Sequence, residues 1–139
     1  MSRRREVLIA WGPVLVLMAL IFVLSAQPKP APPAYAKGVY FSGVVPIFTA
    51  QGPEVLVKKG AHVVEYGLLG VLIMRGLLAQ GVSTREAAYL AILLAISYAL
   101  ADELHQAFVP GRHAMVLDIG IDYVGAASAC LLARRMVRT

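Results

Sequence analysis

The chain carries an unusual run of polar side chains at the end of a segment otherwise apolar enough to span a bilayer, Ser97-Tyr-Ala-Leu-Ala-Asp-Glu-Leu-His-Gln-Ala-Phe-Val-Pro-Gly-Arg112. Its carboxylates, imidazole, carboxamide and guanidinium are groups that bind phosphate, ligate metals or transfer protons. A charged group at the centre of a membrane helix costs about 2.5–3.5 kcal/mol, and less near the interface. Such residues therefore indicate either structural pairing or a functional site.

Two further segments carry similar side chains. At about 100° per residue, each of the three segments places its polar groups on one helix face. The residues that share a face are His62, Glu65, Tyr66 and Leu69, then Tyr98, Asp102 and His105, then Asp118, Asp122 and Gly125. Because a carboxylate facing lipid is expensive, we expect these faces to point at one another, with Gly125 and Ala129 allowing close helix approach.

Composition indicates an integral membrane protein. Apolar residues make up 59% of the 139 residues and charged residues 15%, whereas a soluble domain carries about 25% charge. This length predicts a single membrane domain, residues 1–139. The net charge of +5 does not indicate a nucleic-acid partner, because eight of the thirteen basic residues lie in short flanks. The single cysteine, Cys130, excludes an internal disulfide and is expected to be a helix-packing residue.

Four apolar segments predict an all-α fold, a four-helix membrane bundle with spans at about residues 7–25, 59–78, 85–106 and 114–133. The first segment is longer than a signal-peptide core and is followed by three more spans, so we expect an uncleaved anchor. Ser83 or Thr84 is the expected N-cap of the third helix, and Pro110-Gly111 predicts a tight turn after it.

Residues 27–53 hold six of the eight prolines, so no long helix is expected there. The aromatic residues in this segment favour an interfacial loop lying on the bilayer between the first two helices. A flexible connector is the alternative interpretation.

Charge asymmetry predicts a multi-pass protein of the cell membrane with both termini in the cytoplasm. Eight basic residues then lie inside and five outside, four of them in the long loop, where the positive-inside rule weakens. In this orientation the polar residues of the three helix faces all fall in the outer halves of their spans, which favours one outer-leaflet site over separate structural pairs.

Each polar group also has a structural interpretation. Asp118 and Asp122 are able to pair with Arg112 or Lys59 as links between helices. Glu103 lies about 140° from Tyr98 around the helix, so it is expected to face solvent or Arg112.

The same residues resemble the VanZ-like family of small membrane proteins, named after a teicoplanin-resistance protein. The resemblance is carried by Lys59-x-x-His62-x-x-x-Tyr66, by the block from Ser97 to Arg112, by Asp118-x-x-x-Asp122-x-x-Gly125, and by Ser25-Ala26-Gln27-Pro28. It covers nearly the whole chain in order. Asp122 departs from the family pattern, in which this position is usually Asn. The resemblance implies a bacterial cell-envelope protein, with reduced glycopeptide susceptibility as the phenotype of the founding member.

The first functional hypothesis is binding of an anionic membrane lipid or a lipid-linked cell-wall precursor, without a cofactor. Lys59 and Arg112 would meet the phosphate, and the remaining polar groups would fix Arg112 and contact sugar or peptide. We expect Asp102 and Arg112 to form an ion pair when no ligand is bound. The predicted binding residues are Lys59, His62, Tyr66, Asp102, Glu103, His105, Gln106, Arg112, Asp118 and Asp122.

The alternative is a membrane hydrolase or transferase acting on such lipids. His62 or His105 would be the general base, with Asp102 orienting it. A metal-dependent form would use nitrogen and oxygen ligands from His62, Glu65, Asp102, His105 and Asp118. The sequence contains no known catalytic signature that favours this alternative. Proton-coupled transport is weaker still, because four spans contain no inverted repeat.

Overall fold

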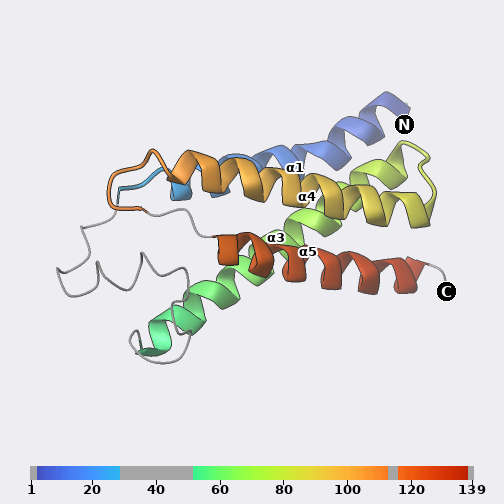
Figure 1. Cartoon of the computed structure of the whole chain (residues 1–139). Helices are drawn as coiled ribbons and strands as arrows, with labels where there is room; N and C mark the ends of the chain where they lie inside the picture. Colours follow the sequence, from blue (N-terminus) through green and yellow to red (C-terminus); the bar gives the residue numbers. More distant parts are fainter. Residues whose placement is uncertain (1–2, 29–51, 113–115, 138–139) are drawn as a thin grey trace.

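The computed structural model describes residues 3–28, 52–112 and 116–137 (Figure 1). These residues form four helices and no strand: α1 (Arg3–Ser25), α3 (Gly52–Ala79), α4 (Thr84–Gln106) and α5 (Val116–Val137). Each helix is long and apolar enough to cross a membrane. The predicted all-α membrane bundle of four helices is therefore confirmed. Most of the predicted proline-rich loop, residues 29–51, lies outside the described residues.

The second helix begins earlier than the sequence indicated. Helix α3 begins at Gly52, about two turns before Lys59, although its membrane-spanning part is Lys59–Ala79. Pro53 was assigned to the preceding loop because proline interrupts helices. In the first turn of a helix, however, the missing N–H of proline costs no hydrogen bond, so Pro53 is compatible with this start.

Local sequence signals set both ends of α4. Ser83 is its N-cap, and the Ser83 hydroxyl accepts a hydrogen bond of 3.3 Å from the backbone N–H of Glu86. After the helix, the N–H of Arg112 donates to the carbonyl of Val109 at 3.1 Å, and Gly111 has a φ of 75°. Proline followed by a left-handed glycine is the pattern of a type II turn. The predicted turn is thus present, and it brings Arg112 back towards the end of α4.

Helix α3 is the centre of the bundle. It packs against α1, α4 and α5, whereas α1 and α5 make no contact within the described part of the chain. The two chain ends and the α3–α4 connection lie at one end of the bundle (Figure 1). The end of α1, the turn after α4 and the start of α5 lie at the opposite end. We call this opposite end, which carries the predicted site residues, the polar end.

Small residues bring α3 and α5 into backbone contact. A Cβ atom added at Gly125 would overlap the carbonyl oxygen of Val63, and one added at Gly67 would lie 3.4 Å from the Cβ of Ala129. Cys130 is fully buried on the same side of α5, as expected of a packing residue. The predicted close approach through Gly125 and Ala129 is present, and it fixes how the polar residues of α3 and α5 face each other.

We predict that Gly125→Ala lowers the thermal stability of the protein in detergent. The added methyl group meets backbone, which moves less readily than a side chain, so the loss is about 3 kcal/mol, at the upper end of overpacking costs. Gly120→Ala is the matched control on the same helix, because nothing lies within 4 Å of a Cβ at that position. Equal melting temperatures for the two variants would contradict the contact.

Candidate functional site

A chain of hydrogen bonds joins α1, α4 and the following turn at the polar end. Asp102 is 6% exposed, and its two carboxylate oxygens accept from the Ser25 hydroxyl at 2.5 Å and from the Gln106 amide at 2.7 Å. The Gln106 carbonyl oxygen in turn accepts from Nη1 of Arg112 at 3.1 Å. Each buried polar group in this series of hydrogen bonds has a partner, which is the condition for stability in an apolar surrounding.

Arg112 also caps the C-terminal end of α1. Its Nε donates to the carbonyl of Gln27 at 3.1 Å, and its Nη2 donates to the carbonyl of Leu24 at 2.7 Å. The last carbonyls of a helix lack partners within the helix and carry its partial negative charge, so a guanidinium there is favourable. All three acceptors of Arg112 are neutral oxygens. No carboxylate among the described residues forms an ion pair with it.

Two side-chain contacts link α3 to α5 at the same end, an ion pair between Lys59 and Asp118 and a hydrogen bond between His62 and Asp122. Lys59 lies 2.5 Å from Asp118, and Nδ1 of His62 lies 3.1 Å from Asp122. The Asp122 side chain is 2% exposed, whereas that of His62 is 33% exposed. These pairs match the interpretation of the α5 carboxylates as links between helices, and Asp118 pairs with Lys59 rather than with Arg112.

Tyr66 lies between these two networks, one helical turn beyond His62. Its side chain is 1% exposed, and its hydroxyl has no hydrogen-bond partner among the described residues. Asp102 and Glu103 of α4 and Asp122 of α5 are all close enough to act on that hydroxyl electrostatically. Tyr66 thus brings a buried hydroxyl, without a partner among the described residues, to the part of the bundle that holds the acidic side chains of α4 and α5.

His105 holds the second unpartnered polar atom of the polar end. Its ring stacks on Phe22 of α1 with 4.5 Å between the ring centroids, and its Nε2 is buried without a partner among the described residues. Stacking on an aromatic ring fixes the plane of the imidazole. It does not satisfy the hydrogen-bonding capacity of the ring nitrogen Nε2.

The structure corrects three expectations from the sequence. Asp102 and Arg112 form no direct ion pair, because the carboxamide of Gln106 stands between them. Glu103 does not face solvent, since it is 4% exposed and is buried within the bundle. The shared face of Tyr98, Asp102 and His105 contacts α1, where the Tyr98 hydroxyl donates to the Met18 carbonyl at 2.6 Å.

The contribution of α1 was missing from the predicted site. Ser25 binds Asp102 directly and Phe22 supports His105, yet neither was named among the binding residues. The sequence does give a reason to include Ser25 in the site, because Ser25 is the hydroxyl residue that ends an apolar span and belongs to the Ser25-Ala26-Gln27-Pro28 segment. The sequence gives no such reason for Phe22, since it is one apolar residue among many in that span.

The metal-dependent alternative gains no support from the arrangement of its ligands. Among the described residues, no three His, Cys, Asp or Glu side chains gather closely enough to hold a metal ion. Three of the five residues named for it belong instead to separate contacts: His62 pairs with Asp122, Asp102 bonds Ser25 and Gln106, and Asp118 pairs with Lys59.

We predict that Asp102→Asn destabilises the protein by about 1–3 kcal/mol, because one buried donor, Ser25 or Gln106, then faces an amide instead of an acceptor. Melting in detergent measures the loss. Glu86→Gln is the matched acid-to-amide control at the exposed start of α4, and it should change stability by no more than about 0.5 kcal/mol.

The Ser25→Ala variant completes a double-mutant cycle with Asp102→Asn. The two losses should not add, because both substitutions remove the same hydrogen bond. Additive losses would show that the Ser25–Asp102 contact contributes nothing to stability.

The comparisons with known proteins agree with the site motifs. The model of the VanZ/LLP1 family matches residues 10–137, which is nearly the whole chain and includes every residue of the candidate site. Searches of curated proteins and of solved structures found no significant match. With four membrane-spanning helices in the described residues and this match, the chain is a multi-pass membrane protein that belongs to the VanZ/LLP1 family.

Proposed function

We propose that this protein binds the anionic headgroup of a membrane lipid or lipid-linked cell-wall precursor at the polar end, in the outer leaflet. The observation that carries the proposal is the environment of Arg112. Its guanidinium is partly exposed and is held in place by three neutral oxygens. Its positive charge is thus fixed in position without a neutralising carboxylate among the described residues.

The geometry of Arg112 suits a phosphate group. A guanidinium carries five N–H donors, and the three contacts of Arg112 occupy one on each nitrogen. One N–H therefore remains on each of Nη1 and Nη2. A phosphate that accepts from both would form a bidentate, charge-assisted contact, which is stronger than a contact with a lysine ammonium.

Lys59 has a smaller part in the proposal than the sequence indicated. Asp118 lies 2.5 Å from its ammonium and neutralises it. A headgroup would therefore have to displace Asp118 to reach Lys59, whereas it can approach Arg112 directly. Tyr66 and His105 add an unpartnered hydroxyl and an unpartnered ring nitrogen, which suit the oxygen-rich sugar or diphosphate part of a lipid-linked precursor.

The outer-leaflet location rests on charge and on the position of the chain ends. The start of α1 and the end of α5 lie at the end of the bundle opposite the turn that follows α4 (Figure 1). That end carries the Arg3-Arg4-Arg5 and Arg134-Arg135 clusters, which the positive-inside rule assigns to the cytoplasm. A protein that binds lipid-linked precursors on the outer surface would alter how a lipidated glycopeptide reaches them. This agrees with reduced glycopeptide susceptibility, the phenotype of the founding member of the family.

One observation favours the hydrolase or transferase alternative. Nδ1 of His62 lies 3.1 Å from the buried Asp122, and the ring is one-third exposed. A histidine held by a carboxylate on one nitrogen can act as a general base through the other. Asp102 does not take this orienting role, because both of its oxygens bind Ser25 and Gln106. Release of phosphate from undecaprenyl diphosphate by the purified protein would support this alternative.

We predict that Arg112→Lys weakens binding of undecaprenyl phosphate about tenfold while the protein remains folded. Lysine keeps the charge but loses the two-pronged contact, and a lost charge-assisted hydrogen bond costs about 1.5 kcal/mol. Binding is measured on purified protein in detergent, with the uncharged alcohol undecaprenol as the ligand control. The matched protein control is Arg75→Lys, an exposed arginine of α3 far from Arg112.

Wild-type protein should prefer the phosphate over the alcohol, and only Arg112→Lys should reduce that preference. Equal binding of the two lipids by wild-type protein would reject an anion site. An Arg112→Lys protein of unchanged affinity would remove this residue from the site and leave it as the cap of α1.

We predict opposite effects of Tyr66→Phe on stability and on binding. The buried hydroxyl has no partner, so removing it should raise stability by about 1 kcal/mol. The same change should weaken undecaprenyl phosphate binding if the headgroup supplies the missing partner. Melting and binding are measured on the same preparation. A loss of stability would show instead that the hydroxyl is already satisfied in the unbound protein.

A further inference from the structure

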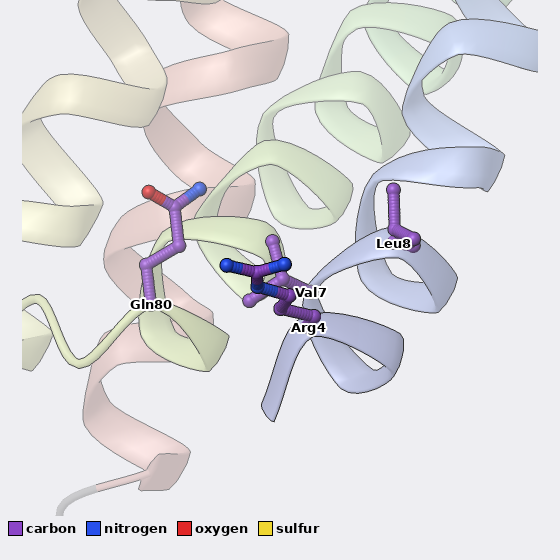
Figure 2. Close-up of a pocket in the computed structure, with 4 residues that line it drawn as sticks. All are labelled: Arg4, Val7, Leu8 and Gln80. Atoms are coloured by element: carbon purple, nitrogen blue, oxygen red, sulfur yellow. The ribbon is translucent and has the colours of Figure 1, made fainter. Parts of the chain in front are cut away.

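An opening lies at the end of the bundle opposite the polar end, between α1 and the end of α3. It has a volume of about 530 Å³ and is lined by Arg4, Val7, Leu8 and Gln80 (Figure 2). Val7 and Leu8 make its wall mainly apolar, and the guanidinium of Arg4 and the amide of Gln80 give it polar groups. We call it the α1–α3 crevice. Its volume is in the range of pockets that hold small ligands.

The packing of Trp11 explains why the crevice forms. The indole ring lies against Gly76, where an added Cβ would stand 2.8 Å from the ring. One turn further along each helix come Val7 on α1 and Gln80 just after α3. Helix α3 ends at Ala79 and the chain turns away through Gly81, which has a φ of 88°. Helix α1 continues to Arg3, past the level at which α3 ends.

The position of Arg4 indicates what the crevice would hold. Arg4 is exposed and forms no ion pair within the described residues. It is also the first residue of the candidate span Arg4–Ser25, which places it at the depth of lipid headgroups. The crevice therefore combines an apolar wall with a cation at the depth of the headgroups. These two features suit the two parts of an anionic phospholipid, its acyl chain and its headgroup.

We propose that the α1–α3 crevice binds one anionic phospholipid of the leaflet that faces the two chain ends. The phosphate contacts Arg4, with the amide of Gln80 beside it, and an acyl chain lies along Val7 and Leu8. Basic pockets between membrane helices bind anionic headgroups through the same combination of charge and apolar contact. This site is independent of the one at Arg112, because it lies at the opposite end of the bundle.

The single tryptophan provides a local readout. Trp11 is the only tryptophan in the chain, and it lies one helical turn from the crevice but about 20 Å along α1 from Ser25 and the polar end. Bromine atoms on a lipid chain quench tryptophan fluorescence only at short range. The full-length protein is reconstituted into phosphatidylcholine vesicles that contain a fixed fraction of brominated phosphatidylglycerol or, in parallel, of brominated phosphatidylcholine.

Wild-type protein should be quenched more by brominated phosphatidylglycerol than by brominated phosphatidylcholine. Arg4→Gln should reduce the apparent preference for phosphatidylglycerol about fivefold, the effect expected for one cation near an anionic headgroup. The matched control is Arg5→Gln, because Arg5 is an exposed neighbour that does not line the crevice. Its preference should equal that of the wild-type protein.

A second variant tests the apolar half of the site. Val7→Phe fills the crevice and should reduce quenching by both brominated lipids, whereas Val16→Phe, at an exposed position of the same helix, should not. Equal quenching of wild-type protein by the two lipids would overturn the proposal. So would equal losses for Arg4→Gln and Arg5→Gln, since these would indicate diffuse attraction without a site. Neither outcome depends on whether Arg112 binds a lipid.

Discussion

A buried carboxylate in an apolar bundle is stable only if each oxygen has a donor, and the polar end is organised around this requirement at Asp102. Its two donors come from different parts of the chain, Ser25 at the end of α1 and Gln106 one turn further along α4. Gln106 then orients Arg112, and Arg112 closes the end of α1. One carboxylate thereby ties together the first helix, the third span and the turn that follows it.

The sequence predicts those parts of this arrangement that depend on neighbouring residues. Apolar length identifies the spans, Ser83 marks the start of α4, and Pro110-Gly111 requires a turn. Helical phase also identifies Tyr98, Asp102 and His105 as one face. Phase cannot tell which helix that face meets, because the answer depends on how helices far apart in the chain pack. For this reason the prediction directed the face at α3 and α5, whereas its hydrogen-bond and stacking partners on other helices are Met18, Phe22 and Ser25 of α1.

The pairing of charges was predictable in kind but not in detail. Sequence alone allowed the α5 carboxylates to pair with Arg112 or Lys59, and the structure selects Lys59 for Asp118 and His62 for Asp122. The contact of Gly125 with the backbone of Val63 decides this, because it brings the polar-end halves of α3 and α5 face to face. Glu103 follows the same logic. Glu103 is expected about 140° from Tyr98 around the helix, but its side chain is buried in the structure, so it does not face solvent.

The backbone contact between α3 and α5 also constrains movement. Two helices whose main chains touch cannot slide or rotate past each other without a clash, so α3 and α5 form a fixed wall on one side of the polar end. Helix α1 is held differently there, by hydrogen bonds and one ring stack to α4 and its turn. Under the function proposed above, a headgroup too large for the site would enter by tilting the end of α1, and this movement would break the hydrogen bonds that Arg112 donates to Leu24 and Gln27.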